Sequence, residues 1–561
     1  EGTQGFGTGA AVGGWGRAHE PPSPASSPGG ATAIASRSFS ALRSERRLDA
    51  VRARKAPVPP STIFPAVLAR CIGVGVVALV LGFALVLLRG EPYVASDQGV
   101  FLSVAGRLLD GDSLYAEVFD NKDPLFFYSY AAALWVGGWR GPFLLDALWL
   151  AVGAISVALV ARELRAPRSV VLASLVVYPL ALTAGWYLVG LSMLGALALA
   201  PVVPWLWIRG WCAASGAVLV GAMLMKLNLA PVVAGPLAGL VALGVPAISR
   251  RRAVVRGALG AGGAAVVAAA VLAVRGELRP YLETFAYNIH YSSARTQADG
   301  LVGRTLEHLR VAWDFLYLAG RWQLPAAILL LAAFGAAAYL AFTRGSRPER
   351  ALAVAALGAL VGAIVVIATT AYGEEHLQLL AYPATLIAAA LIWRVDSMLG
   401  ARWGAVAAAG VATFAVWSAV KAPAGTEVSS LWTARPISPG AIALEGARAR
   451  FASTDREIGY MVFGSNSEGG HAAFIDRSFD LRCRFFHLYL FSLEEQYDET
   501  IACAERQRPD FVLVTLGFFE PYGDYPEWNA FVERARRFLE GSYELVEEEH
   551  PGVSVWRLRS G

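Results

Sequence analysis

The stretch DQGVFLSVAGRLLDGDSLYAEVFDNKDPLFFY, residues 97–128, decides how the rest of the chain is interpreted. It follows an apolar run, CIGVGVVALVLGFALVLL (71–88), that is long enough to cross a bilayer. It combines several acidic side chains and Lys122 with many aromatic and aliphatic ones. A loop in water would not need the apolar side chains, and a segment in lipid would not tolerate the charges. The pattern is therefore typical of a segment at the boundary between lipid and water.

Composition indicates a polytopic α-helical membrane protein. Of the 561 residues, 56% are hydrophobic and 16% are charged, and the mean hydropathy is +0.48. Soluble domains carry about a quarter charged residues. The 16 Trp and 19 Tyr residues suit aromatic belts at two membrane interfaces. We therefore expect the lipid bilayer, and not a nucleic acid, to be the main partner of this surface.

The basic connections predict the orientation of the chain, because Lys and Arg flank the cytoplasmic ends of spans. The loop ARELRAPR (161–168) is the clearest of them. The segment 124–139 then begins and ends outside, so we expect a juxtamembrane or re-entrant helix there. The N-terminus is expected inside and the C-terminus outside, with eleven spans at about 71–89, 141–160, 169–186, 187–208, 211–226, 229–247, 254–274, 322–342, 351–371, 377–393 and 402–420.

Three regions differ in kind. Residues 1–60 lack an apolar period and are rich in Gly, Ser and Pro, so we expect a disordered, basic cytoplasmic tail. Residues 61–420 form the membrane domain, with its first outer loop at 90–139. Residues 421–561 alternate helical and strand patterns, for example EEQYDETIACAERQ and then RPDFVLVTL, and predict a small α/β extracytoplasmic domain. Cys483 and Cys503 are free to pair there if the compartment is oxidising.

Polar residues are concentrated in three outer connections, 91–124, 276–321 and 372–376, whereas the span centres are mostly Ala, Val, Leu and Gly. Lys226, near the outer end of its span, is the exception. This distribution favours an amphiphilic substrate at the outer boundary over an ion in transit. Sugar transfer from a polyprenyl phosphate suits such a place. It needs a carboxylate to accept the proton of the acceptor hydroxyl and cations to hold the departing phosphate.

Several phrases resemble the GT-C fold glycosyltransferases, the branch with lipid A aminoarabinose transferases and protein O-mannosyltransferases. SDQG and GRLLDGDSLYAEVFDNKDPLFFY resemble the first outer loop of that branch. YGEEHLQLLAYP (372–383) resembles its late outer loop, and GAMLMKLN resembles its G-x-x-x-x-x-K phrase. RPDFVLVT, FLEGSYELV and VWRL resemble its small terminal domain. The resemblance covers about residues 65–561 and implies a GT-C-like transmembrane domain with juxtamembrane helices in the first outer loop.

The resemblance also implies roles for individual residues. Asp97 matches the catalytic base, Lys122 the lysine that binds the donor phosphate, and His376 the late-loop histidine near the donor or a metal. Lys226 matches the lysine of the G-x-x-x-x-x-K phrase. Further donor or substrate contacts are expected from Gln98, Tyr115 and Arg295.

Three positions depart from the family pattern. Asp123 stands where the first Pro of a K-P-P-L phrase is expected, which changes the local charge. Asn121 replaces an acidic metal ligand that some relatives carry. Gln98 replaces the Glu of the protein mannosyltransferases, which argues against a protein acceptor. No cofactor is implied with certainty, and the candidates for holding a divalent metal ion are Glu375 and His376.

Each of these residues has a simpler alternative. Asp97 is placed to cap the helix that follows it, and Lys122 and Lys226 suit interfacial lysines that reach the headgroups. Glu374, Glu375 and His376 also fit a solvated turn. YNIHYSSAR (287–295) fits either the acceptor groove, through Tyr287, His290, Tyr291 and Arg295, or a structural loop. Asp110, Asp112 and Asp120 are expected at the surface or in turns.

The sequence therefore predicts an inverting glycosyltransferase, a hexosyl- or pentosyltransferase of the bacterial plasma membrane. Its donor would be a polyprenyl-phosphate sugar such as a mannosyl or arabinosyl lipid. Its acceptor would be a cell-envelope glycan, a glycolipid or a protein on the outer face. Two alternatives remain open at this stage: a transporter or flippase of lipid-linked glycans, which needs a polar path through the spans, and a non-catalytic GT-C-like assembly subunit.

Overall fold

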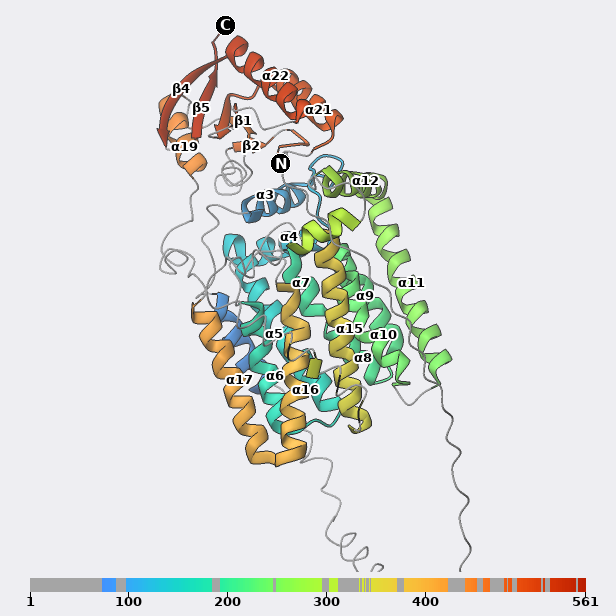
Figure 1. Ribbon diagram of the computed structural model, residues 1–561. Coiled ribbons are helices and arrows are strands. Elements are labelled where there is room, and N and C mark those ends of the chain that lie inside the picture. Colours follow the sequence, from blue (N-terminus) through green and yellow to red (C-terminus); the bar gives the residue numbers. More distant parts are fainter. Residues whose placement is uncertain are drawn as a thin grey trace, which may run out of the picture. The chain divides into compact units, whose positions relative to one another are not determined.

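The structure of the protein is a computed structural model. It is mostly helical and contains a mixed β-sheet near the C-terminus (Figure 1). Its helices run alongside one another, and α3, α4 and α12 lie together at the end nearest the sheet. The structure describes residues 73–86, 97–183, 192–245, 249–294, 302–310, 345–370, 378–421, 439–451, 458–464, 479–481, 483–486, 492–515, 518–519, 525–550 and 553–560, with single positions at 332, 335–336, 339 and 343.

The helices of the N-terminal and central parts follow the apolar runs of the sequence. A first apolar helix covers Gly73–Val86. The next are α3 (Asp97–Asp110), α4 (Pro124–Gly137), α5 (Gly141–Glu163), α6 (Arg168–Leu182), α7 (Ser192–Leu199), α8 (Val202–Ile208), α9 (Cys212–Met225), the 3-10 turn η2 (Leu227–Leu229), α10 (Ala230–Ala242), α11 (Arg250–Val274), α12 (Leu278–Ala294), α15 (Arg347–Thr370), α16 (Ala381–Leu399) and α17 (Ala401–Lys421).

Within the described residues, four helices are long and apolar enough to cross a membrane: Gly141–Glu163, Arg250–Val274, Arg347–Thr369 and Gln378–Leu399. Shorter apolar helices occupy most of the other expected spans. The segment 124–139 is helical, as α4, in agreement with the sequence-based prediction. The expected span 322–342 lies almost wholly outside the described residues, so the total of eleven spans stays a prediction.

Two segments differ from the prediction. The expected span 187–208 contains two short helices, α7 and α8, separated at Ala200 and Pro201, because a proline cannot continue the hydrogen-bond ladder of the preceding helix. The start of the expected polar loop 276–321 is helix α12 instead of an extended loop. Its apolar residues recur at helical spacing, a signal that the sequence-based prediction overlooked among the polar residues of this segment: Leu278, Tyr281, Leu282, Phe285 and Ile289.

Glycines allow helices to approach closely where α10 meets α15. A Cβ added at Gly235 would lie 2.0 Å from the carbonyl oxygen of Gly358, and one added at Gly358 would lie 2.2 Å from that of Gly235. The two backbones are therefore in direct contact. Close packing through small residues is the usual way in which helices associate in lipid, where apolar side chains gain little from meeting each other.

The C-terminal region contains a five-stranded sheet in the order β2-β1-β3-β5-β4. The pairs of β1 with β2 and β3 are parallel, and those of β5 with β3 and β4 are antiparallel. The elements are α19 (Pro439–Phe451), β1 (Ile458–Phe463), β2 (Phe479–Leu481), α21 (Glu494–Gln507), β3 (Phe511–Thr515), α22 (Pro526–Ser542), β4 (Tyr543–His550) and β5 (Val553–Leu558).

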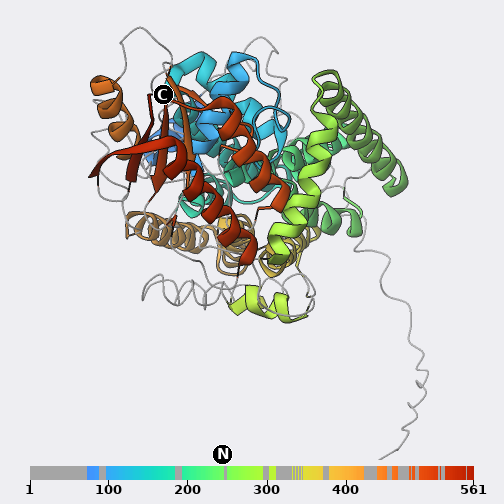
Figure 2. The ribbon, with the colours of Figure 1, turned by 90° about the horizontal axis from the view of Figure 1, so that it is seen from above.

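Helices cover both faces of this sheet, with α21 and α22 side by side on one face and α19 on the other (Figures 1 and 2). Side chains of β1 alternate between the two cores. Tyr460 and Val462 pack on the α19 side, and Met461 and Phe463 pack on the α21 and α22 side. The strand and helix patterns predicted for β3, α21, α22 and β5 are confirmed, whereas the placement of the region outside the membrane stays a prediction.

Candidate active site

Lys122 lies in the loop between α3 and α4, and its ammonium group is held by neighbours. Its Nζ donates to Asn121 Oδ1 at 2.6 Å and lies 3.9 Å from Asp120 Oδ1. It also lies 5.5 Å from the centre of the Phe101 ring of α3, within reach of a cation–π contact. The side chain is only 17% exposed. A cation in such partly dry surroundings attracts an anion more strongly than a fully hydrated lysine does.

Asp123 joins this loop to two distant elements. Its Oδ2 accepts the backbone N–H of Leu227 in η2 at 2.7 Å, and its Oδ1 accepts the hydroxyl of Tyr281 on α12 at 2.7 Å. Although Asp123 occupies the N-cap position of α4, its side chain makes no capping hydrogen bond. Burial raises the pKa of Asp123, and the two hydrogen bonds and the charges of Lys226 and Lys122 offset only part of that rise.

Lys226 occupies the break between α9 and η2, where its backbone is extended. Its Nζ donates to the hydroxyl of Ser192, the first residue of α7, at 3.0 Å. Lys122 directly precedes Asp123 in the chain, and Lys226 directly precedes Leu227, the residue that donates to Asp123. Both lysines also lie near this carboxyl, because the positive charge of each lowers its pKa. The structure brings together two lysines that are far apart in sequence, as a site for a phosphate requires.

Tyr115 holds the backbone of Lys122 in place. Its φ is +66°, a conformation that an L-residue adopts only when its surroundings impose it. Its buried hydroxyl donates to the backbone carbonyl of Lys122 at 2.7 Å, and its ring centre lies 5.3 Å from that of Tyr281. Burial raises the pKa of the Tyr115 hydroxyl. The expected direct contact between Tyr115 and a substrate does not fit this enclosed position, because both the ring and the hydroxyl are used inside the protein.

Asp97 and Gln98 are the first two residues of α3, and their side chains lie outside the described part of the structure. The backbone nevertheless constrains residue 97. It precedes Phe101 by one helical turn, so the two positions share a face of α3 about 6 Å apart. The ammonium group of Lys122 lies over the Phe101 ring. The helix therefore brings position 97 to the neighbourhood of Lys122, and the convergence of the two side chains stays a prediction.

Glu277 connects α4 and the loop between α3 and α4 to the end of α11. It lies at the junction of α11 and α12, fully buried. Its Oε1 accepts the backbone N–H of Leu114 at 3.0 Å and the Nε–H of Arg275 at 2.9 Å. Its Oε2 accepts the hydroxyl of Tyr128 on α4. Sequence reasoning missed this residue. The available signal was weak: an acidic residue beside an arginine, directly after the apolar run 254–274.

The C-terminal region contacts the same loop. Arg484 Nε donates to the carbonyl oxygen of Tyr115 at 2.7 Å, and the Arg484 carbonyl accepts the N–H of Phe119 at 3.0 Å. Arg107 of α3 donates to the carbonyl oxygen of Cys483 at 3.3 Å. Cys483 forms a disulfide with Cys503 of α21, which ties this contact segment to the helix. The pairing that the sequence left open is therefore present.

Some predicted site residues lie outside the described part of the chain. These are the late-loop residues Glu374, Glu375 and His376, and also Arg295. The metal site expected at Glu375 and His376 is therefore untested. Among the residues that the structure describes, no group of three or more His, Cys, Asp or Glu side chains is placed to hold a metal ion.

Two predictions from sequence are wrong in detail. Asp120 was expected at the surface or in a turn, but it is only 1% exposed, and its Oδ1 accepts the backbone N–H of Lys122 at 3.0 Å. Tyr287 was a candidate for sugar stacking, but it is buried against Phe119 and Phe485. Both residues became enclosed because the C-terminal region and α12 pack onto the loop, which local sequence patterns do not reveal.

Asp146 also departs from the expected apolar character of the spans. It is buried in α5, 2% exposed, about 7.5 Å along the axis from the start of that helix. It therefore lies near the outer end of the predicted span and not at its centre. Like Lys226, it is therefore an ionisable group near the outer end of a predicted span.

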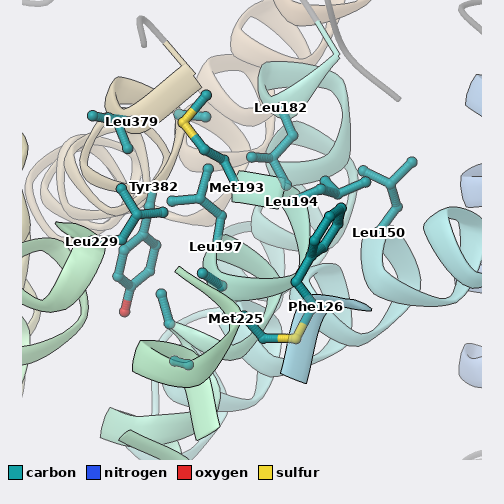
Figure 3. Close-up of a cluster of buried hydrophobic side chains, with 14 of the residues drawn as sticks. Phe126, Leu150, Leu182, Met193, Leu194, Leu197, Met225, Leu229, Leu379 and Tyr382 are labelled. Atoms are coloured by element: carbon teal, nitrogen blue, oxygen red, sulfur yellow. The ribbon is translucent and has the colours of Figure 1, made fainter. Parts of the chain in front are cut away.

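A cluster of buried hydrophobic side chains includes residues next in sequence to the site (Figure 3). It brings together side chains from α4, α5, α6, α7, α9, η2, the turn before α16 and α16 itself: Phe126, Leu150, Leu182, Met193, Leu194, Leu197, Met225, Leu229, Leu379 and Tyr382. Met225 directly precedes Lys226, and Met193 directly follows Ser192. Buried apolar side chains therefore adjoin the polar site on both α7 and α9, and such surroundings strengthen the interaction of a charge with an anion.

Comparison with solved structures identifies proteins of similar fold. A crystal structure of ArnT from Cupriavidus metallidurans bound to undecaprenyl phosphate matches 87% of this chain and 98% of that one, with a TM-score of 0.50 and 14% sequence identity. This likeness confirms the GT-C fold that the sequence resemblance predicted. The apo structure of the same protein matches 88% of this chain and 98% of that one, with a TM-score of 0.39 and 16% identity.

A cryo-EM structure of the arabinofuranosyltransferase AftD from Mycobacteria also matches 87% of this chain, with a TM-score of 0.41 and 14% identity. The match covers 40% of the AftD chain. No family model matches the sequence, and no curated protein does.

Proposed function

We propose that this chain is an inverting glycosyltransferase that moves a sugar from a polyprenyl-phosphate donor to a cell-envelope acceptor on the outer face of the bacterial plasma membrane. The observation that carries the proposal is the pair of lysines, Lys122 and Lys226, which lie near the buried carboxyl of Asp123 and next in sequence to buried apolar side chains. It occurs in a fold shared with a protein whose crystal structure contains undecaprenyl phosphate. A lipid phosphate needs cations for its head and an apolar surface for its tail.

In the proposed reaction, the oxygen of an acceptor hydroxyl forms a bond with the anomeric carbon of the donor. The bond from that carbon to the phosphate oxygen breaks, and its electron pair leaves with the phosphate. Asp97 accepts the proton of the acceptor hydroxyl. Lys122 and Lys226 stabilise the growing negative charge on the phosphate. Attack from the side opposite the leaving group inverts the configuration at the anomeric carbon.

Other groups have supporting parts in this proposal. Asp123 and Tyr115 hold the backbone that carries Lys122. Gln98, Arg295 and His376 remain candidates for contacts with the donor, with or without a divalent metal ion at Glu375 and His376. The disulfide between Cys483 and Cys503 supports an outer location for the C-terminal region, because such bonds persist in oxidising compartments.

The test uses purified protein in detergent with radiolabelled polyprenyl-phosphate sugars and a set of envelope acceptors. Wild type is expected to consume at least one donor, and Asp97→Asn is expected to lose transfer while it still binds that donor. Asp110→Asn is a matched control, because Asp110 is an exposed aspartate at the other end of α3. If no donor is consumed while an authentic glycosyltransferase works in parallel, the proposal is wrong. Equal transfer by Asp97→Asn and wild type would remove Asp97 from its role.

The two alternatives have less support. A transporter needs a polar path through the centres of the spans, but two buried hydroxyls of the described helices are taken up by nearby backbone carbonyls. Ser174 donates to Val170 at 2.8 Å, and Thr385 donates to Ala381 at 2.8 Å. A non-catalytic subunit would have no need for two partly buried lysines at one carboxylate.

A further inference from the structure

A cavity of about 600 Å³ lies between α12 and the beginnings of α21 and α22. His290 of α12 forms one wall, the segment from Ser492 to Asp498 forms the second, and Tyr525, Glu527 and Trp528 form the third. The volume is within the range of pockets that bind small molecules. The cavity is separate from the lysine pair and has no part in the proposed donor site.

The cavity is acidic. Its lining includes four carboxylates, Glu494, Glu495, Asp498 and Glu527, and none of its described lining residues is a lysine or an arginine. Asp498 pairs with Arg534, whereas within the described part of the chain the three glutamates make no ion pair. A concave surface of one charge sign favours ligands of the opposite sign and repels those of the same sign. An anionic ligand therefore does not fit.

The cavity is also aromatic. Tyr497, Tyr525 and Trp528 belong to its lining. Tyr497 and Trp528 meet edge to face with ring centres 5.8 Å apart, and Tyr497 stacks on Phe531 at 4.8 Å. Tyr497 and Trp528 are 1% and 9% exposed and form a rigid support, whereas Tyr525 is half-buried and is the ring open to a ligand. Aromatic faces bind the C–H faces of sugar rings, while carboxylate oxygens accept hydrogen bonds from hydroxyl and ammonium groups. Together they are the chemistry of a carbohydrate site.

The cavity is close to the candidate active site but not continuous with it. Asn288 of α12 donates to the carbonyl oxygen of Asn121, next to Lys122, at 3.2 Å. His290 follows two residues later, about 200° around the helix axis. The cavity and the Lys122 loop are therefore separated by the thickness of α12, about 10 Å. A ligand that reaches both places must be longer than one sugar.

We propose that this cavity binds the remote part of an acceptor oligosaccharide that bears free hydroxyl or protonated amino groups and no anionic group. Its part as an acceptor site rests on the proposed transferase function, whereas its binding of a glycan does not. The half-buried ring of Tyr525 contacts a sugar face, and the exposed glutamates accept hydrogen bonds from the hydroxyl and ammonium groups. Binding here keeps the far end of the acceptor in place while its reacting end extends around α12 toward Lys122.

Direct binding tests the site without any reaction. The probes are tetrasaccharides of glucosamine, N-acetylglucosamine and galacturonic acid, titrated calorimetrically into the full chain in detergent. We expect the glucosamine probe to bind most tightly, the N-acetylglucosamine probe more weakly, and the galacturonic acid probe not at all. If no probe binds, or if the galacturonic acid probe binds as well as the glucosamine probe, the proposal is wrong.

Variants connect the binding to the cavity. The double variant Glu495→Gln with Glu527→Gln should weaken glucosamine binding about fivefold, because each carboxylate is solvent-exposed and contributes modestly. The matched control, Glu505→Gln with Glu540→Gln, removes two exposed carboxylates from the same helices outside the cavity and should not change binding. Melting temperatures of both variants check the fold. Equal affinity of the cavity variant and wild type would contradict the proposal.

Transfer assays separate the failure of this proposal from that of the proposed function. With an active donor, the cavity variant should raise KM for a tetrasaccharide acceptor and leave KM for the donor unchanged. Normal transfer with an unchanged acceptor KM contradicts the acceptor site but not the transferase. Specific binding of the glucosamine probe without transfer from any donor contradicts the transferase but not the glycan site.

Discussion

At the scale of single residues, the charge of Lys122 is the property that the proposed reaction uses most directly. Lys122→Gln keeps a hydrogen-bond donor but removes the charge, so kcat/KM for the lipid donor should fall by about 10²- to 10³-fold, the usual loss for one group that stabilises a developing anion. Lys122→Arg keeps the charge and should retain more activity than Lys122→Gln. Steady-state transfer assays at varied donor concentration measure kcat/KM of both variants. If Lys122→Gln has the kcat/KM of wild type, the lysine does not bind the donor phosphate and is only an interfacial lysine that reaches the headgroups.

The buried carboxyl of Asp123 should make the stability of the folded protein depend on pH. Burial raises the pKa of its carboxyl in the folded protein. The folded state therefore binds this proton more tightly than the unfolded state, and folding loses stability as the pH rises through the raised pKa. Asp123→Asn does not titrate. The unfolding temperature of Asp123→Asn should therefore rise relative to that of wild type as the pH rises from about 4 to 7.

The control for this pH series is Asp110→Asn, which removes a carboxylate from the exposed end of α3 in the same region. It separates the effect of the Asp123 site from the general effect of one less negative charge. A difference between Asp123→Asn and wild type that stays constant across the pH range would contradict the prediction.

The sequence identified the lysines of the site but not the groups that hold them. Lys122 and Lys226 belong to short phrases that can be recognised without knowledge of the fold. Asp123 bonds to Leu227 and Tyr281, which follow it by 104 and 158 residues. Glu277 bonds to Leu114 at a separation of 163 residues. Patterns within one window contain no information on such partners, so the supporting network could not be predicted from one sequence.

At the scale of elements, the junction of α11 and α12 depends on buried Glu277. Glu277→Gln leaves one acceptor oxygen for three donors, so unfolding should become easier by about 1–3 kcal/mol, the cost of leaving a buried donor without an acceptor. The free energy of unfolding by denaturant in micelles measures the change. The matched control on the same helix is Glu283→Gln, because the exposed pair of Glu283 with Arg279 should contribute at most about 0.5 kcal/mol. Equal losses in both variants would contradict the assignment.

The disulfide between Cys483 and Cys503 is the second element-scale feature with a clear consequence. It closes a loop with a sequence separation of 20 residues, for which loop-closure entropy gives a stabilisation of about 3 kcal/mol. The double variant Cys483→Ser with Cys503→Ser should therefore unfold at a lower temperature than wild type. Dithiothreitol should lower the melting temperature of wild type and leave that of the double variant unchanged, and insensitivity of both would contradict the prediction.

Elements with a clear apolar period were predictable, and those shaped by distant contacts were not. Amphipathic patterns located α21 and α22, and continuous apolar runs located β3 and α5. The break at Lys226 was seen only as the end of a span. Helix α12 carries Tyr281, which bonds to Asp123, and Tyr287, which packs on Phe119. The apolar residues of α12 recur at helical spacing, but that local pattern does not reveal which distant residues the helix contacts.

At the scale of the whole molecule, three segments that are distant in sequence meet at one place. The loop between α3 and α4 bonds to α12 through Asp123 and to the C-terminal region through Phe119 and Arg484. In the proposed function, the donor binds at Lys122 and Lys226, and the remote part of the acceptor binds in the cavity on the other side of α12. Both require the C-terminal region to be on the same side of the membrane as the first outer loop.

This requirement predicts the outcome of cysteine labelling. In a background without Cys71 and Cys212, Glu505→Cys places a thiol on an exposed face of α21, and Ser249→Cys places one at the exposed start of α11, next to the arginines expected inside. A membrane-impermeant maleimide should label Glu505→Cys in intact spheroplasts and Ser249→Cys only after permeabilisation. Basic residues are retained on the cytoplasmic side, so the two positions should differ. Labelling of Ser249→Cys alone would place the candidate active site away from the outer face, where a polyprenyl-phosphate donor and an envelope acceptor were proposed to meet. Labelling of both positions from outside would contradict the predicted threading of α11.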